Sequence, residues 1–584
     1  SNQWVPKEYA GSYSGTSFYL KFADGSSLGT DSSGEGNNWS TSSLSSTDKV
    51  IDSPTNNFST LNLLCSPKVT LSEGALETKS TDGAWRSTSS TFYMTSGKWY
   101  WEGYVQAKGT YVMFGIVPER RSSGRMNFDV DHYPGTYSDE WGYESRGYLH
   151  NSANPDTSWG NTFDTGDIIS VALDMDSGTL KFYKNNSQQG STITGISTSK
   201  VYRAVFTNWS TSSITNVNFG QDSSFAGEKT AQGNTDSEGV GDFYYSVPSG
   251  YKALCSANLT NPTIKLPNKH FKAKMYTPNS SNLSVTGYGF QPDLLWLKSR
   301  TQSYRHYWFD AVRGTGQKAL SSHHNAMEGD DAGSLSSFDS DGWTTGGSSG
   351  FNDNGSGTNG AMSYAWKAGG SGSSNTSGNI TSTVSTNTTA GFSIVTYTGT
   401  GSQNTVGHGL GVKPKAIITK LRDTNTQDWM FYPKQFTGNA NTYIKFNTTD
   451  GVASDSHTYP NVEPTSTVYT VGGDDGGDGT NGNGKAYVAY VFSEVEGYSK
   501  FGTYGGNGLT NGSFVYTGFQ PAFIITRRYD GGSNWYIWDP VREGNPMNSP
   551  LQANDAGTES ANYDNSVDIL SNGFKLRATN AGTN

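Results

Sequence analysis

In Gly97-Lys-Trp-Tyr-Trp-Glu-Gly-Tyr-Val-Gln106, the apolar residues Trp99, Trp101 and Val105 all stand at odd positions. Successive side chains of a β-strand point to opposite faces, so the odd positions are expected to line a core and the even positions to face water. The stretch therefore predicts a strand with one buried face.

Similar short apolar segments, bounded by Gly, Asn, Asp or Ser, recur along the chain. They lie at 110–116, 168–174, 179–184, 201–207, 214–219, 293–298, 416–421, 486–492 and 522–527. No window longer than about twelve residues has a clean helical period. The predicted fold class is all-β, with an N-terminal antiparallel β sandwich followed by a tandem of small β-sandwich repeats.

The composition of this 584-residue chain argues against some classes of binding partner. The formal net charge of −10 opposes nucleic acid, whose binding depends on Lys and Arg neutralising phosphates. No apolar run approaches the length of a membrane span, so membrane insertion is not expected. The start, Ser1-Asn-Gln-Trp-Val-Pro6, lacks a signal-peptide pattern, so the protein is not exported by that route or the sequence is part of a longer chain.

Two cysteines, Cys65 and Cys255, cannot supply a disulfide framework for this much chain. One disulfide between them and two buried free thiols both remain open. Stability must come from apolar cores, with oligomerisation as an addition.

A short motif occurs twice: Gly-Phe-Gln-Pro precedes the predicted strands at 293–298 and 522–527, and an Asp follows each Pro by eighteen residues. An Arg follows each Asp by three residues, and such a pair is expected to lock a turn through bidentate hydrogen bonds rather than to catalyse. The repeated anchors are Pro292, Asp310 and Arg313 in one copy and Pro521, Asp539 and Arg542 in the other.

A degenerate copy lies between these two, with Pro414 before its strand and no Asp and Arg pair. The first two copies close on aromatic strands at 362–366 and 487–492, whereas the sequence stops before the corresponding position of the third. We predict a sandwich over 1–260 and repeats over 261–380, 381–500 and 501–584, the last one truncated. The polar, Gly-rich stretches 221–242 and 368–390 are expected to form a long loop and a linker.

Residues 97–220 resemble the SPRY domain, an antiparallel β sandwich of about this length. The matching pieces stand in the expected order: Gly97–Glu102, Tyr111–Ile116, Gly147-Tyr148, Gly166–Ile169, Leu173-Asp174, Leu180–Asn185 and Val217–Gly220. Ahead of them, Phe18–Phe22 followed by Asp31–Trp39 resembles the first strand and turn of laminin-G or concanavalin-like lectin sandwiches.

The combination of this lead-in, a SPRY-like sandwich and the Gly-Phe-Gln-Pro repeats is similar to virion proteins of tailed phages, notably cyanophages and other marine phages. The repeat domain of those proteins has no known activity. The resemblance implies a tail-fibre type of protein located in the virion and made in the host cytoplasm without a signal peptide.

The richest group of aromatic and carboxylate residues in the SPRY-like region lies between 129 and 144. Aromatic faces stack on sugar rings and carboxylates accept bonds from hydroxyls, so this group is a candidate glycan site, although a loop that packs over the sandwich has the same composition. The candidate residues are Tyr133, Tyr137, Asp139, Glu140, Trp141 and Tyr143. Asp129 and Asp131 nearby are a carboxylate pair, which a glycan-cleaving enzyme would need.

No zinc, phosphate-loop or nucleophile motif stands out, so no catalytic residue is predicted. Calcium is a weak candidate at Asp474, Asp475 and Asp478 in a Gly-rich run, because Ca²⁺ prefers carboxylate and carbonyl oxygens. Aspartates that simply form turns are the favoured interpretation there. No other cofactor is expected.

The sequence thus predicts a non-enzymatic phage appendage protein that binds a bacterial surface glycan or other receptor, alongside other virion proteins. Multivalent display would raise the avidity of weak sites, and the resembling family suggests a homotrimer. The alternatives are a purely structural head-decorating fibre or spacer and, third, a capsular depolymerase. A spacer should bury its Trp and Tyr residues, whereas a receptor-binding protein should expose several together.

Overall fold

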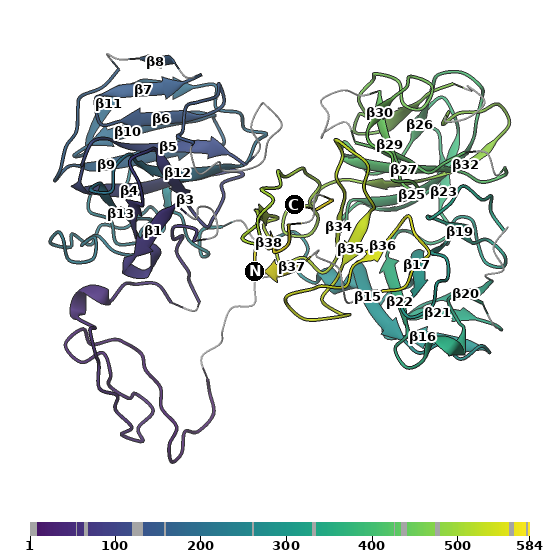
Figure 1. The fold of residues 1–584 in the computed structure, drawn as a ribbon, viewed down its shortest axis with the longest axis horizontal. Coiled ribbons are helices and arrows are strands. Elements are labelled where there is room, and N and C mark those ends of the chain that lie inside the picture. The colour runs from purple at the N-terminus through teal and green to yellow at the C-terminus, as the bar shows by residue number, and fades with distance from the viewer. Residues whose placement is uncertain are drawn as a thin grey trace. The chain divides into compact units, whose positions relative to one another are not determined.

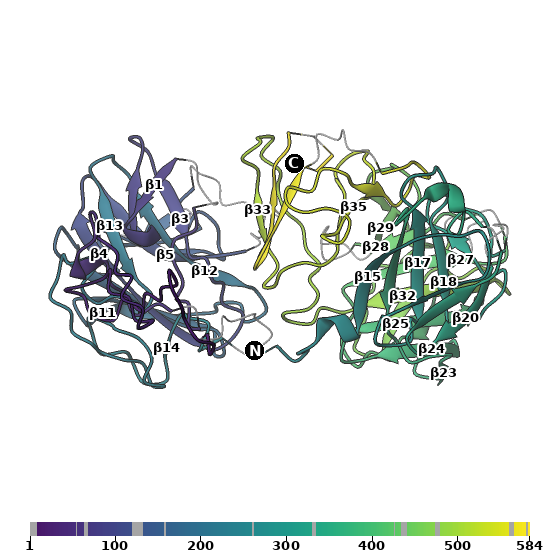
Figure 2. The same cartoon turned by 90° about the horizontal axis from the view of Figure 1, so that it is seen from below.

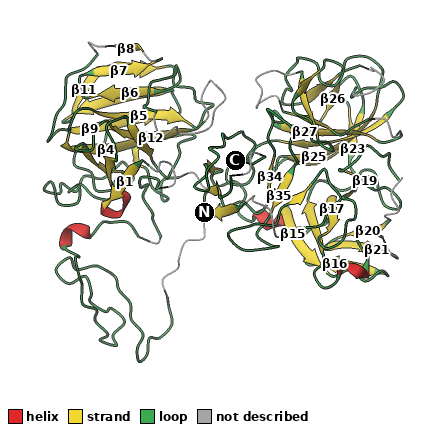
Figure 3. Ribbon diagram, viewed as in Figure 1, coloured by secondary structure: helices red, strands yellow, loops and turns green. Residues whose placement is uncertain are grey.

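The computed structural model describes residues 9–583 except 54, 64–67, 120–131, 153, 157–158, 260–261, 330–333, 348, 425–426, 434–440, 474–478, 560–565 and 580–581. The chain forms two compact units, Gln3–Thr260 and Asn261–Asn584. The described ranges consist of strands and loops with short 3-10 segments, as Figure 3 shows: η1 (Ser46–Asp48), η2 (Glu73–Ala75), η3 (Pro267–Lys269) and η4 (Asn354–Ser356). The all-β prediction is confirmed. None of the helical segments in these ranges is long and apolar enough to cross a membrane.

The first unit is a sandwich of two antiparallel sheets (Figures 1 and 2). One sheet has the order β1 (Val69–Ser72), β2 (Glu77–Ser80), β13 (Ile214–Asn218), β4 (Lys98–Ala107), β9 (Ile168–Asp174), β10 (Thr179–Lys184) and β11 (Ser187–Thr194), with β14 (Lys252–Ala253) parallel to β4. The other has the order β3 (Arg86–Ser89), β12 (Tyr202–Asn208), β5 (Val112–Pro118), β6 (Trp141–Glu144), β7 (Tyr148–Asn151) and β8 (Asn154–Asp156). Buried side chains such as Trp99, Trp101, Phe114 and Phe206 form the core between the sheets.

The even positions of β4 do not face water as predicted. Tyr100, Glu102 and Tyr104 are buried as well, because residues 219–256 fold over the outer face of this sheet. The ring of Phe243 lies 5.2 Å from that of Tyr100, and the backbone N–H groups of Tyr244 and Tyr245 donate to the Glu102 carboxylate. The predicted long loop therefore covers the sheet.

Two further expectations are corrected. The lead-in that resembles a lectin strand contains only an isolated bridge between Leu20 and Asp31, and no strand precedes Val69 in the described residues. The predicted linker 368–390 contains β23 (Ser373–Asn375) and β24 (Ser382–Asn387), which pair with each other. These polar residues satisfy their backbone groups in a sheet and bury Ile380 and Val384, which a composition count overlooks.

The second unit contains three successive copies of a similar arrangement, each with two sheets. The first copy has β15 (Phe271–Tyr276), β22 (Ala361–Trp366), β17 (Leu294–Ser299), β18 (Tyr307–Asp310) and β19 (Leu320–Ser321) in one sheet and β16 (Leu283–Thr286), β21 (Gly342–Thr345) and β20 (Leu335–Asp339) in the other.

The strands that the other two copies share with the first follow the same order. The second has β23, β24, β25 (Phe392–Thr398), β32 (Ala486–Phe492), β27 (Ala416–Leu421), β28 (Met430–Tyr432), β29 (Thr442–Lys445) and β30 (Ala453–Ser454), with β26 (Asn404–Gly407) and β31 (Val468–Val471) as its smaller sheet. The third has β34 (Ile524–Thr526), β35 (Tyr536–Trp538) and β36 (Leu551–Gln552), with β33 (Phe514–Tyr516), β38 (Gly573–Leu576) and β37 (Val567–Leu570).

The three copies share one register in their first hairpin. Trp296 pairs with Trp308, Ile418 with Phe431 and Ile525 with Ile537, each pair four residues after the motif proline or its counterpart. By this register, Asp310, Pro433 and Asp539 hold the same position.

The copies form a closed ring around a shared core that includes Trp296, Trp308, Trp429, Phe446 and Trp535. The same backbone hydrogen bond joins each copy to the next and the third copy to the first. The three bonds run from Glu328 N to Arg422 O (2.8 Å), from Val452 N to Tyr529 O (3.1 Å) and from Glu559 N to Arg300 O (2.7 Å).

Candidate functional site

A group of aromatic side chains lies at one end of neighbouring strands in the first unit. Because Arg86 pairs with Asn208 and Asn208 with Val112, the residues just beyond these strand ends come together: Trp85, Trp209 and Tyr111. Tyr133 joins them from the loop before β6, Arg146 from the turn between β6 and β7, and Tyr148 from the start of β7. We call these six residues the aromatic patch.

Four rings of the patch contact one another, Tyr148 is connected to them through Arg146, and the patch is open to solvent. The ring of Trp85 lies 5.0 Å from Trp209, 5.4 Å from Tyr133 and 6.0 Å from Tyr111, measured between centroids. All five aromatic side chains are half-buried, and Arg146 is exposed. The guanidinium of Arg146 lies 4.4 Å from the ring centre of Tyr111 and 4.6 Å from that of Tyr148, within the range of cation–π attraction.

A buried carboxylate fixes the position of Arg146. Glu144 is fully buried at the end of β6 and accepts two bonds of 2.6 Å from Arg146, through Nε and Nη2. His150 lies 3.0 Å from the same carboxylate. Burial alone would raise the pKa of Glu144, but hydrogen bonds from His150 and Arg146 hold this pKa below its usual value. The patch therefore has a charged group held at a defined place among its rings.

The structure separates the residues that the sequence grouped as a glycan site. Tyr133 is part of the aromatic patch, and Tyr137 is half-buried with its ring 5.6 Å from His132. Asp139 is buried and pairs with Lys200 at 2.6 Å, while Glu140 is fully buried against His132 at 2.7 Å. Both carboxylates are thus engaged inside the domain.

Trp141 and Tyr143 belong to the hydrophobic core, which contradicts the expectation that they are exposed for stacking on a ligand. Trp141 is 8% exposed and Tyr143 is fully buried, with the rings of Phe163 and Phe182 at 5.0 and 5.6 Å. The reason is that both residues lie in β6, on the face turned towards the other sheet. Their loss would disturb the fold before it affected binding.

Sequence reasoning missed Trp85, Tyr111, Arg146, Tyr148 and Trp209. The available signal was that Trp85, Tyr111 and Trp209 each stand directly beside a strand, as in Asn208-Trp209. Only the pairing of strands distant in sequence shows that these strand ends meet.

The calcium candidates Asp474, Asp475 and Asp478, and the carboxylate pair Asp129 and Asp131, lie outside the described residues. Within the described ranges, no group of three or more His, Cys, Asp or Glu residues is placed to hold a metal ion. Cys255 is a buried thiol, and burial raises its pKa, whereas Cys65 lies outside the described residues.

In the second unit the repeated Asp and Arg pairs are buried. Arg313 Nε donates to Asp310 at 2.5 Å, and Arg542 Nε donates to Asp539 at 2.5 Å. In both pairs a second guanidinium nitrogen donates to a backbone carbonyl, of Trp308 or of Ile537. Pro292 and Pro521 are buried just ahead of β17 and β34. The hydrogen bonds of each pair connect the side chains to backbone groups of the same turn, so we interpret the pairs as structural.

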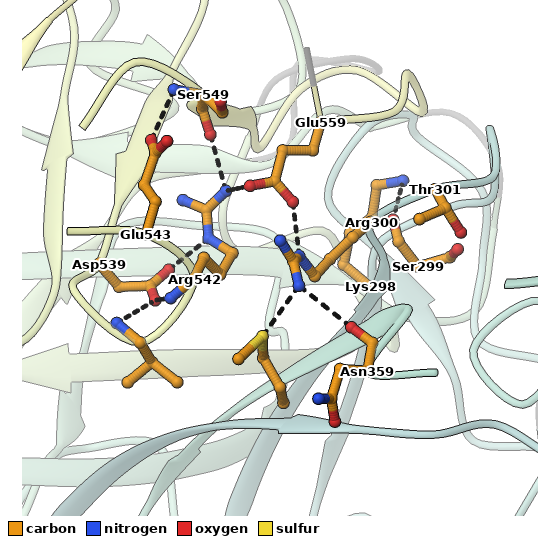
Figure 4. A network of polar contacts seen from close by, with 12 residues as sticks. Lys298, Ser299, Arg300, Thr301, Asn359, Asp539, Arg542, Glu543, Ser549 and Glu559 are labelled. Carbon is orange, nitrogen blue, oxygen red and sulfur yellow. Dashed lines mark hydrogen bonds and ion pairs between the residues drawn. The ribbon is translucent and has the colours of Figure 1, made fainter. Parts of the chain in front are cut away.

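Each pair also receives a tyrosine from another copy. Tyr490 of the second copy donates to Asp310 at 2.8 Å, and Tyr364 of the first copy donates to Asp539 at 2.7 Å. Figure 4 shows how the chain of ionic groups continues at the second of these junctions, where Glu559 lies between Arg542 (3.2 Å) and Arg300 (2.5 Å).

Two family models match the sequence. The model described as SPRY domain matches residues 98–222, which confirms the resemblance at 97–220. The model described as "Domain of unknown function (DUF7483)" matches residues 266–584. No curated protein matches the chain.

Several solved structures are similar to the SPRY region. The crystal structure of a human SPRY domain is 17% identical, with 26% of this chain and 94% of that chain covered and a TM-score of 0.21. The SPRY domain of human HERC1 is 20% identical, with 27% and 96% covered and a TM-score of 0.23. The stonustoxin structure is 21% identical, with 27% of each chain covered and a TM-score of 0.22.

Proposed function

We propose that this chain, which belongs to the DUF7483 family and carries a SPRY domain ahead of the family region, binds a carbohydrate through the aromatic patch without catalysis. A SPRY domain is a binding module. The observation that carries the proposal is the half-exposed cluster of five aromatic rings around Arg146.

The chemistry of the patch suits a sugar. Rings such as those of Trp85 and Trp209 offer flat apolar faces for the C–H side of a pyranose, and burying one such ring contributes on the order of 1.5–3 kcal/mol. Arg146 offers N–H groups for hydroxyls, and its bonds to Glu144 limit the entropy lost when it binds. Apolar groups gathered at a surface mark interaction sites.

The setting that we propose is a phage virion, where the protein would act as a tail-fibre type of appendage on a bacterial surface glycan. The support is the sequence resemblance of the SPRY region and the Gly-Phe-Gln-Pro motifs. We also propose association with other virion proteins and a homotrimer, since linked weak sites gain affinity through effective concentration.

One observation favours the structural alternative for the second unit. Most tryptophans of that unit are buried, among them Trp308, Trp343, Trp429 and Trp538, as expected for a spacer. We therefore assign binding to the first unit and a supporting role to the ring of three copies. The depolymerase alternative depends on Asp129 and Asp131, which lie outside the described residues.

The test replaces Trp209 by Ala and measures adsorption to host cells and binding to an array of bacterial glycans. Loss of one stacking ring should weaken binding at least tenfold, while the melting temperature stays within about 2 °C, because Trp209 is half-exposed. Trp39→Ala is the matched control, since Trp39 is 57% exposed and outside the patch.

Unchanged adsorption by Trp209→Ala and by Arg146→Ala would remove the patch as the binding site. Release of reducing sugar ends from host capsule by the unaltered protein would favour the depolymerase instead. Trp141→Ala is expected to lower the melting temperature because Trp141 is a core residue, so that variant is unsuitable for a binding test.

A further inference from the structure

Three lysines of the first copy meet at one turn. Lys269 ends η3, and Lys272 and Lys274 lie two residues apart in β15, so their side chains leave the strand on the same face. Their ammonium groups donate to carbonyl oxygens of the turn after β16: Lys274 to Thr286, Lys272 to Gly287 at 2.5 Å and Lys269 to Gly289 at 3.5 Å. We call these three side chains the lysine strip.

Two glycines let the ammonium groups approach the backbone of this turn. Gly287 and Gly289 have φ angles of +87° and +76°, in the region that favours glycine. A Cβ built on Gly287 would lie 3.1 Å from Lys274 Nζ, and one built on Gly289 would lie 2.7 Å from Lys269 Nζ. The turn therefore holds like charges close together on one small surface.

The lysine strip has an excess of positive charge. Asp341 is the carboxylate nearest to the turn, and its two oxygens accept from the backbone N–H groups of Gly289 and Gly287. These bonds, together with the charges of Lys272 and Lys274, hold the pKa of Asp341 below its usual value. In the part of the chain that the structure describes, no carboxylate lies within 4.0 Å of the three ammonium nitrogens. The strip thus remains positive in a chain whose formal net charge is −10.

The fold of a copy does not require these lysines. By the register of β15 with β22 and of β25 with β32, the strip corresponds to Ala390, Ser393 and Val395 of the second copy. All three of those residues are buried. The glycine three residues before the proline is present there too, as Gly411, but nothing lies within 4 Å of a Cβ built on it. The strip is therefore an addition to the first copy.

The donors of the strip indicate the chemical class of its ligand. An ammonium group has three N–H donors, and each lysine of the strip donates to one carbonyl of the turn, which leaves donors for a ligand. Lysines bind phosphate as point charges, whereas a planar carboxylate is matched best by the fork of an arginine. A long polyanion such as nucleic acid would extend beyond the strip over a chain of net negative charge. These properties favour a single phosphate group.

We propose that the lysine strip binds the phosphate group of a phosphorylated sugar. The phosphate oxygens accept from the ammonium groups of Lys269, Lys272 and Lys274 and offset their mutual repulsion. The choice of phosphate rests on the strip alone, whereas the choice of a sugar as its carrier rests on the proposed glycan-binding function. The site is separate from the aromatic patch and adds a binding role to the ring of three copies.

The experiment titrates glucose 6-phosphate and, separately, inorganic phosphate into the full chain by isothermal titration calorimetry at low ionic strength. We expect both to bind 1:1. The affinity for glucose 6-phosphate should rise as pH increases through about 6, where a phosphate monoester loses its second proton. Lys272→Gln combined with Lys274→Gln should weaken the binding of both ligands at least tenfold, because two hydrogen bonds between charged groups are lost.

The matched control combines Lys265→Gln with Lys413→Gln, which removes the same charge at two exposed positions of the same unit. This control should bind both ligands as the unaltered protein does. Lys269→Gln, also at an exposed position, should by itself weaken binding without lowering the melting temperature, which separates loss of the site from loss of the fold. Trp209→Ala should leave phosphate binding unchanged, so failure of the aromatic patch and failure of the strip are distinguishable.

Equal binding by the strip variant and the control variant would overturn the proposal. No heat of binding with either ligand at millimolar concentration would do the same, and would leave the lysines a role in protecting the edge strand β15 from pairing with other chains. Binding of inorganic phosphate without glucose 6-phosphate would overturn the sugar as carrier. Tighter binding of a double-stranded oligonucleotide, abolished in the strip variant, would make nucleic acid the ligand instead.

Discussion

Asp310 shows how a charged residue can be buried completely in this protein. Its carboxylate accepts from the backbone N–H and the Nε of Arg313 and from the hydroxyl of Tyr490. Burial by itself would lower the pKa of Arg313, but the charge of Asp310 raises it well above its usual value. Arg313 therefore stays charged, and its guanidinium and the Asp310 carboxylate each have several hydrogen-bond partners.

Removing one member of such a pair leaves the other charge buried and uncompensated. Asp310→Asn and Asp539→Asn should each lower the free energy of unfolding by about 3–5 kcal/mol, measured by urea denaturation. Asp530→Asn is the control, because Asp530 pairs with Arg528 at the surface and should show no measurable change. Equal stability of all three variants would show that the buried pairs are dispensable.

At the scale of single elements, two glycines hold equivalent places at the start of β21 and β38. A Cβ built on Gly342 would lie 1.9 Å from the carbonyl oxygen of Val285, and one on Gly573 would lie 2.1 Å from that of Val515. Gly342→Ala and Gly573→Ala should therefore each push the paired strand away and lower stability by about 1–3 kcal/mol.

Gly544→Ala is the matched control for this pair, since nothing lies within 4 Å of a Cβ built there. Thermal unfolding of the three variants checks the prediction. A drop for Gly544→Ala as large as for Gly573→Ala would mean that the close strand approach is not the cause.

The sequence predicted elements well where local pattern decides them. The predicted strands at 168–174, 179–184, 416–421 and 486–492 agree with β9, β10, β27 and β32 residue for residue. The prediction failed for the outer face of β4, which residues 219–256 cover. The alternation of apolar and polar residues within a strand does not show whether another segment packs on its polar face. Similarly, Ser382–Asn387 became a strand because β25 pairs with it, not through its own composition.

The candidate site was predictable only in part, because its residues come together through the pairing of strands that are distant in sequence. Tyr133 was named from sequence, but Trp85 and Trp209 join it through strand pairings more than a hundred residues apart. Trp141 looked like a loop residue because it follows a polar stretch, yet it pairs with Ile116 inside the sandwich. Grouping by sequence proximity thus selected core residues and left out the surface ones.

At the scale of the whole molecule, two buried lysines make stability depend on pH. Lys298 and Lys420 are fully buried and donate to carbonyls of neighbouring copies, those of Ala556 and Asn325. Burial lowers the pKa of each lysine from 10.5 to about 7. Between pH 7 and 10.5 the unfolded chain therefore binds protons that the native state does not.

The free energy of unfolding should accordingly rise as pH increases from 7 to 9.5, by up to about 1.4 kcal/mol per pH unit for each lysine. Above that range, tyrosines that are buried in the native state ionise in the unfolded chain and oppose the trend. Urea denaturation at several pH values measures the slope. Lys298→Met should reduce it, and Lys265→Met, at an exposed position of the same unit, should not. A flat profile for the unaltered protein would contradict the prediction.

Closure of the ring has a consequence for the order of events during synthesis. Arg300, Lys298 and Tyr364 of the first copy each have a partner in the third copy, namely Glu559, Ala556 and Asp539. A ribosome that adds about 5–20 residues per second needs roughly 10–50 s to go from Arg300 to Glu559. During that time the nascent first copy lacks these partners from the third copy, so the packing of the first copy is completed only after the third copy has emerged.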